Sequence, residues 1–378
     1  MRPAALLFFA LALPAKAASP AFQNELAGVI DQFYDMQFDK ARAAAQDLAV
    51  KRPTHPAGVF YRGVSTFQRW IAEGMRSTET YHAFEVDNEA SEKLSLALMK
   101  TNPAEAHYYL GATLGFRSRG YAAQKKFFRA FPDGASAVKH LKKALALDPS
   151  LTDARLGMGM YHYFAARMPS GAKPFAYLLI GESPDRKLGL EEIWSVAHST
   201  GISRMEARSV LATILSKDDE ADYAKAEELL AELNGRYPHN PIYRLRRAFV
   251  AEKLGNFDAA VKLADPDGPW FETLHPSVRG PARAWSLYRA TECRLLQGRP
   301  VEAGLWLDAL EKLAHPRGMK DWVVLRRANI LDSQGRKAEA DELYGRVSDK
   351  VPSALAERFR KARYPAGPKD AAPFFTGY

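Results

Sequence analysis

The segments LRRAFVAEKLGNFDAA at 245–260 and LRRANILDSQGRKAEA at 325–340 follow one pattern. Each opens on Leu-Arg-Arg-Ala, reaches a glycine after six further residues, and places an alanine five positions after that glycine. A third copy of the phrase Gly-x-x-x-x-Ala spans 298–303. Glycine ends a helix by taking a left-handed conformation that is costly for other residues, and a small alanine lets the next helix approach closely. The three copies therefore predict three helix hairpins.

A second phrase recurs in which an alanine is followed twelve residues later by a proline. Apolar residues stand four and seven positions after each alanine, which places one apolar stripe on one helix face. Proline disfavours helix at the residue before it, so each helix is predicted to end there. The pairs are Ala41 and Pro53, Ala137 and Pro149, Ala226 and Pro238, and Ala340 and Pro352.

These phrases resemble the tetratricopeptide repeat family. The run Ala137-x3-Leu141-x2-Ala144-x4-Pro149, followed by Gly159, is similar to the signature of its paired helices. Ala226 and Ala260 lie 34 residues apart, which is the period of the family. The resemblance implies an all-α fold in which roughly seven to eight helix hairpins form a right-handed superhelix, a solenoid.

The predicted solenoid covers residues 18–363, and two segments depart from the repeat pattern. Residues 116–134 form a basic aromatic insertion in one hairpin, and residues 167–190 form an insertion in the next. The last segment, 364–378, is rich in proline and glycine and is predicted to be a flexible tail.

The N-terminal residues 1–17 read as a signal peptide. Arg2 precedes a short apolar run, and Ala15-Lys16-Ala17 is a small-x-small cleavage site. No later apolar run is long enough to span a bilayer, so the mature chain is predicted to be exported, periplasmic or extracellular. Cys293 is the single cysteine, which excludes an internal disulfide, and its apolar surroundings favour a core position.

The formal net charge of the 378-residue chain is +9, from 53 Lys and Arg against 44 Asp and Glu. This excess of positive charge favours anionic partners. Its alternative role is to keep a long protein surface soluble. Export removes the obvious nucleic-acid targets, so no nucleic-acid partner is predicted.

Arginine recurs nine residues before each turn glycine, at Arg246, Arg289 and Arg326. Equivalent positions of stacked repeats line up, so the three should form a row, with Arg247 and Arg327 beside two of them. The row could bind carboxylates or phosphates through forked hydrogen bonds. Alternatively, the aliphatic parts of these arginine side chains pack between repeats, and their guanidinium groups lie in water with partners such as Glu292. Tetratricopeptide proteins that bind peptide C-termini use Lys, Asn and Arg; only the arginine is matched here.

Two aromatic groups are further candidates. Tyr109 and Tyr163 fall on first helices, where a tyrosine can be a core residue or can bury its ring and offer its hydroxyl to a groove. Phe127, Phe128 and Phe131, with neighbouring lysines and arginine, could make a peripheral membrane contact or cover the end of their hairpin.

No catalytic constellation is present in the sequence. The nine histidines are dispersed, and no phosphate loop, nucleophile elbow or metal-binding histidine pair occurs, so no catalytic residue, metal or cofactor is predicted. The predicted function is a non-catalytic scaffold or adaptor that binds a protein or peptide on its concave face. Two alternatives stay open, namely a binder of anionic envelope polymer or lipid head groups, and an enzyme with an unrecognised site.

Overall fold

The computed structural model describes residues 20–167, 181, 183–217, 219–314, 316, 318–364 and 372. This described part consists of α-helices and one short 3-10 helix, without strands, which confirms the all-α prediction. None of its helices is both long and apolar enough to cross a membrane. The predicted signal peptide, much of the 167–190 insertion and most of the 364–378 tail lie outside the described residues.

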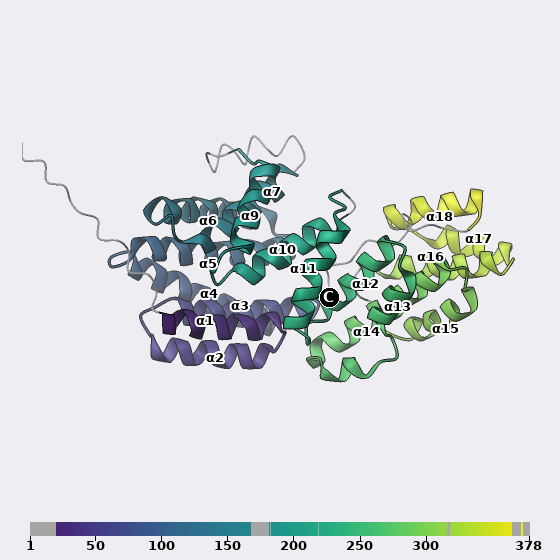
Figure 1. Cartoon of the computed structure of the whole chain (residues 1–378), viewed down its shortest axis with the longest axis horizontal. Helices are drawn as coiled ribbons and strands as arrows, with labels where there is room; N and C mark the ends of the chain where they lie inside the picture. Colours follow the sequence, from purple (N-terminus) through teal and green to yellow (C-terminus); the bar gives the residue numbers. More distant parts are fainter. Residues whose placement is uncertain are drawn as a thin grey trace, which may run out of the picture.

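The helices form two lobes that lie side by side along the long axis (Figure 1). The N-terminal lobe holds α1 (Pro20–Tyr34), α2 (Phe38–Lys51), α3 (Ala57–Ala72), α4 (Thr78–Leu98), α5 (Pro103–Ala123), α6 (Phe127–Leu147), α7 (Thr152–Ala166), α9 (Arg186–Ala197), α10 (Arg204–Leu215) and α11 (Tyr223–Arg236). The C-terminal lobe holds α12 (Pro241–Lys253), α13 (Phe257–Ala264), η1 (Pro269–Thr273), α14 (Pro276–Leu296), α15 (Pro300–Glu311), α16 (Lys320–Ser333), α17 (Lys337–Arg346) and α18 (Lys350–Ala362).

Each helix packs against the next helix along the chain, so the elements form successive hairpins. The first helices of neighbouring hairpins also contact one another, as in α1 with α3, α12 with α14, and α14 with α16. Residues on α12, α14 and α16 are therefore brought together although they lie about a hairpin apart in sequence.

The predicted glycine turns are present. Gly255, Gly298 and Gly335 have φ of 77°, 70° and 79°, in the left-handed region. The residue after each glycine donates its N–H five residues back, as Asn256 does to the Ala251 carbonyl. This bond caps the carbonyls at the end of the first helix. The alanines that follow, Ala260, Ala303 and Ala340, are fully buried, as expected for positions of close helix approach.

Three of the four predicted proline stops are found. Helices α2, α6 and α11 end two residues before Pro53, Pro149 and Pro238. The fourth is wrong, because Pro352 lies in the first turn of α18. A proline fits there because the first N–H groups of a helix have no partner within it.

Residues 116–134 are not a separate insertion between the hairpin helices. They continue α5 and α6 to 21 residues each, and the two helices meet at a turn in which Lys125 has φ of 61°. The segment therefore lengthens both helices of one hairpin.

The N-terminal lobe is closed by contacts between its two ends. Asp31 on α1 accepts hydrogen bonds from Arg236 at 2.6 Å and from the Tyr237 hydroxyl at 2.7 Å, about 205 residues later. Asp35 accepts the main-chain N–H of His239 at 2.9 Å. The first helix thus lies against the junction of α11 and α12, and the helices between them surround an interior space.

Candidate binding pocket of the N-terminal lobe

A pocket of about 230 Å³ lies inside the N-terminal lobe, among α1, α3, α5, α6, α7 and α10. Its wall is mainly aromatic and aliphatic. The apolar lining consists of Ile30, Phe33, Phe60, Val64, Ala112, Phe116, Ala137, Val138, Leu141, Leu156, Met160 and Ile202. A cavity of about 150 Å³ with such a lining stays dry and holds benzene. The space here is larger than one benzene ring requires.

Glycines on α5 and α7 keep this space open. A Cβ atom at Gly111 or Gly157 would lie 2.9 Å or 2.3 Å from the Leu141 side chain, so both glycines make room for that leucine. Gly115 differs, because its Cβ would meet only the Ala137 Cβ, at 3.9 Å. Gly115 lines the pocket, so a larger side chain there would occupy the pocket without a clash at its base.

One side of the pocket is polar. Asp153 on α7 accepts the main-chain N–H of Ser203 at 2.7 Å, just before α10 begins. Tyr61, Tyr108 and the Ser203 side chain also line the pocket and interact with one another. We call this set, together with Glu206 and Tyr34, the polar strip.

Both carboxyl groups of the polar strip are desolvated. Burial raises the pKa of Asp153, against the opposing effect of its hydrogen bonds with Ser203. Burial also raises the pKa of Glu206, and Arg119 and a hydrogen bond with Tyr34 only partly oppose this. A protonated carboxyl can donate as well as accept, so the strip offers both kinds of hydrogen-bonding group.

The pocket combines an apolar wall with a few polar groups on one side. A large apolar wall favours an apolar group, and the few polar atoms on one side fix its orientation. Among the described residues, no three His, Cys, Asp or Glu side chains are grouped so that they could hold a metal ion.

No protein-family model matches the chain, and no curated protein is significantly similar to it.

The predicted arginine row lies in the other lobe. Arg246 stands on α12, Arg289 on α14 and Arg326 on α16. Helix α14 contacts both α12 and α16. Their exposed fractions are 5%, 2% and 2%. The guanidinium groups of Arg289 and Arg326 are therefore shielded from water. The carboxylates that they bind belong to the chain itself.

Glu292 joins the last two members of the row. Arg289 Nη1 donates to Glu292 Oε2 at 2.7 Å, and Arg326 Nε donates to Glu292 Oε1 at 2.9 Å. Arg289 also binds Glu252 of α12, while Arg246 binds the Thr213 hydroxyl. Glu292 is the partner that the sequence spacing indicated.

The two glutamates of this network have different electrostatic surroundings. Burial raises the pKa of Glu252 well above its ordinary value. Burial acts in the same direction at Glu292, but the guanidinium groups of Arg326 and Arg289 hold its pKa below the ordinary value. Glu292 is thus the ionised centre of the network.

The neighbouring arginines connect each first helix to the helix before it. Arg247 Nη2 donates to Glu227 of α11 at 2.7 Å, and Arg327 Nη2 donates to Glu311 of α15 at 2.7 Å. Equivalent residues therefore make equivalent bridges in two hairpins.

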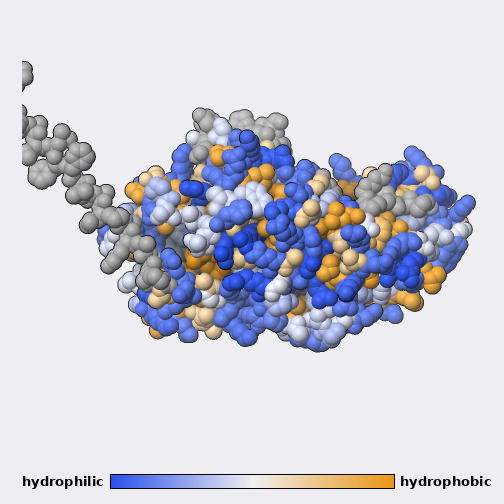
Figure 2. Space-filling model, in the orientation of Figure 1, coloured by the Kyte–Doolittle hydropathy of each residue, from blue (hydrophilic) through white to orange (hydrophobic). Residues whose placement is uncertain are grey.

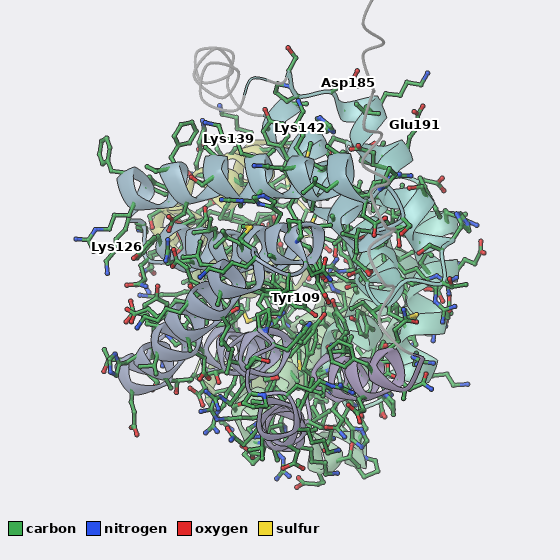
Figure 3. All side chains as sticks on the ribbon, turned by 90° about the vertical axis from the view of Figure 1, so that its left-hand side faces the viewer. Tyr109, Lys126, Lys139, Lys142, Asp185 and Glu191 are labelled. Atoms are coloured by element: carbon green, nitrogen blue, oxygen red, sulfur yellow. The ribbon has the colours of Figure 1, made fainter. Side chains whose placement is uncertain are left out.

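The two predicted tyrosines are both buried, and neither lines the pocket. Tyr109 packs edge-on against His55 and Phe60 and lies inside the lobe (Figure 3). The pocket-lining tyrosine of this helix is instead its neighbour, Tyr108. The Tyr163 hydroxyl donates to Glu220 and accepts from Arg167 Nη1 at 3.0 Å, and burial together with Glu220 raises the pKa of Tyr163 to about 12.

The tip of the α5–α6 hairpin is exposed. Phe128 is 98% exposed and Phe127 is 62% exposed, so these two do not cover the end of the hairpin. Lys126 beside them points away from the lobe (Figure 3). Elsewhere on the face shown in Figure 2, hydrophilic residues predominate and hydrophobic ones are scattered in small groups.

Sequence reasoning missed the pocket residues Asp153, Glu206 and Tyr108. The available signal was the spacing Gly111-x3-Gly115 on α5 together with Gly157 on α7, because glycines inside helices reduce helix stability and call for a packing or functional reason.

Proposed function

We propose that the chain is a non-catalytic adaptor whose N-terminal lobe binds an apolar side chain of a partner polypeptide in the pocket. The observation that carries this proposal is the apolar pocket with its polar strip. In the same proposal the hairpins are tetratricopeptide-like and follow a right-handed superhelix. The glycine-capped turns and buried alanines support that part.

The size of the pocket favours one large side chain, or an apolar molecule of similar size, over a drug-sized ligand. Sites that enclose drug-sized ligands have volumes of about 300–1,000 Å³. The present pocket, at about 230 Å³, is smaller and matches one large anchor residue. Aromatic and other large apolar anchors in such pockets carry most of the free energy of many protein interfaces.

The polar strip suits the main chain that would accompany such an anchor. Tyr61 and Tyr108 hydroxyls and the two carboxyl groups can pair with peptide N–H and C=O groups. Residues 1–17 support export, so we place the partner in the periplasm or outside the cell.

Selection from a random peptide library on the immobilised protein tests the proposal. We expect the selected peptides to share a large apolar residue. Gly115→Leu should weaken their binding more than about tenfold, because it fills the space of an anchor worth about 2 kcal/mol or more. Gly28→Leu is the matched control, since Gly28 is an exposed helical glycine with no atom within 4 Å of its Cβ.

Equal binding of the selected peptides to wild type, G115L and G28L would place their site elsewhere and reject the proposal. Circular dichroism and thermal melting of the three proteins would show that each is folded.

A second candidate function is attachment to an anionic lipid surface. The observation that favours it is the exposed pair Phe127 and Phe128 at a tip that also carries Lys125, Lys126 and Arg129. Aromatic rings that enter the interface and cations that meet anionic head groups are the two components of peripheral membrane binding.

A further inference from the structure

Arg119 on α5 differs from its neighbouring arginines in the N-terminal lobe. Arg62 Nε donates to Asp87 at 2.8 Å, and Arg117 Nε donates to Asp133 at 2.7 Å. The Arg119 guanidinium makes no hydrogen bond and no ion pair with the residues that the structure describes. Within this part of the chain its N–H donors are therefore available to an acceptor from outside.

This arginine lies at the opening of the pocket of the N-terminal lobe. Of the lining residues that the structure describes, Arg119 alone is exposed, and all the others are buried or half-buried. Its guanidinium carbon lies 4.9 Å from the centre of the Phe116 ring, which belongs to the apolar wall, and 5.6 Å from the centre of the Phe67 ring on α3. The attraction between a cation and a ring face keeps the charge beside the apolar wall.

The carboxyl groups of the described lining neutralise Arg119 only in part. They belong to Asp153 and Glu206, and Glu206 interacts electrostatically with Arg119. Burial nevertheless raises the pKa of both, so each is neutral up to a higher pH than an exposed carboxyl is. Over that range Arg119 is the one charged side chain among the described lining residues.

An apolar space with one cation at its opening matches a particular class of ligand. The wall encloses a space of about 230 Å³, which suits an apolar body of one or two rings. A carboxylate on that body can accept forked hydrogen bonds from the guanidinium group. Its single negative charge is balanced by the single charge of Arg119, whereas a cationic ligand would meet a like charge.

We propose that the pocket of the N-terminal lobe also binds a small carboxylic acid with an apolar body, whose carboxylate pairs with Arg119 at the opening. The apolar body occupies the space between the helices, and the carboxylate stays in contact with water because Arg119 is exposed. The inference shares its pocket with the proposed function and adds a second kind of ligand. It does not require that a polypeptide binds there.

The test compares naphthylacetic acid with naphthylacetamide, which have the same apolar body and differ in charge. Isothermal titration calorimetry above the pKa of the acid should show that the protein binds the acid at least about fivefold more tightly, because hydrogen bonds to a charged acceptor are stronger. Arg119→Gln should abolish this preference by weakening the acid alone, and Arg119→Lys should keep part of it. Lys139→Gln is the matched control, since it removes a positive charge from an exposed site on α6 outside the pocket lining, and it should behave like wild type.

The inference would be overturned if wild type bound neither compound, bound both equally, or kept its preference in the Arg119→Gln variant. Loss of the preference in Lys139→Gln as well would assign it to net charge and would also overturn it. Gly115→Leu separates this inference from the proposed function. If it weakened both compounds while wild type bound them equally, the pocket would be an apolar site without a role for Arg119. If the peptide selection failed while wild type preferred the acid, the proposed function would fall and this inference would stand.

Discussion

Glu292 accepts the main-chain N–H of Ala372, 80 residues further along the chain, at 2.9 Å. The same carboxylate accepts hydrogen bonds from Arg289 and Arg326 of two adjacent hairpins. One buried carboxylate thus connects two hairpins and the C-terminal segment. Arg289 and Arg326 depend on this carboxylate for their burial, since buried guanidinium groups need a partner.

Replacement of Glu292 by alanine is predicted to be strongly destabilising. It leaves two buried guanidinium groups without their shared carboxylate, which costs about 3–5 kcal/mol of unfolding free energy. Urea denaturation measures the change. Glu311→Ala removes one of the two carboxylates that bind Arg327 near the surface, the other being Asp308, and should cost at most about 1 kcal/mol. Similar losses in the two variants would contradict the buried network.

The carboxyl of Glu206 should make stability depend on pH. Burial raises its pKa, so the folded protein binds this proton more tightly than the unfolded chain does. The stabilisation is therefore present at low pH and is lost as pH rises from the ordinary glutamate value through the raised one. Glu206→Gln cannot ionise, so its unfolding free energy relative to wild type should increase with pH across that range. Urea denaturation between pH 4 and pH 8 measures it, and a constant difference would contradict the raised pKa.

The turn glycines should be sensitive to alanine. Gly335 has φ of 79° and open space around its Cβ, so Gly335→Ala tests backbone conformation alone. We expect a loss of about 1 kcal/mol in unfolding free energy. Gly304→Ala, inside α15 and also in open space, should instead stabilise by up to about 1 kcal/mol because alanine is the better helix former. If both substitutions changed the unfolding free energy in the same direction, the left-handed turn at Gly335 would be refuted.

The tip of the α5–α6 hairpin should govern any membrane attachment. Phe128→Asp removes an exposed ring and adds a negative charge, so co-sedimentation with vesicles rich in anionic lipid should fall several-fold. Thermal stability should be unchanged, because this side chain makes little contact with the fold. Val301→Asp, at an exposed apolar site on α15, is the control and should sediment like wild type. Equal sedimentation of all three proteins would reject the membrane candidate.

Local patterns predicted the hairpins because their determinants are local. The glycine at 255, 298 or 335 and the alanine five residues later decide a turn within one hairpin. The position of the arginine row could also be predicted, since equivalent positions of neighbouring hairpins align. Its burial could not, because Glu252 comes from another hairpin and Ala372 from the far end of the chain.

The pocket lay beyond sequence reasoning for a related reason. Its lining comes from six helices between Ile30 and Glu206. Those helices surround a space because α1 meets the α11–α12 junction, where Asp31 binds Arg236. No spacing within one helix indicates a contact between residues so far apart.

Titration with N-phenyl-1-naphthylamine, an uncharged apolar fluorophore, tests most directly whether the pocket of the N-terminal lobe is a binding site. Wild type and Gly28→Leu should each enhance the fluorescence saturably, with one probe per chain. Gly115→Leu should bind the probe more than about tenfold more weakly, because its side chain occupies the apolar space. Equal enhancement by all three folded proteins, or none by wild type, would contradict the account.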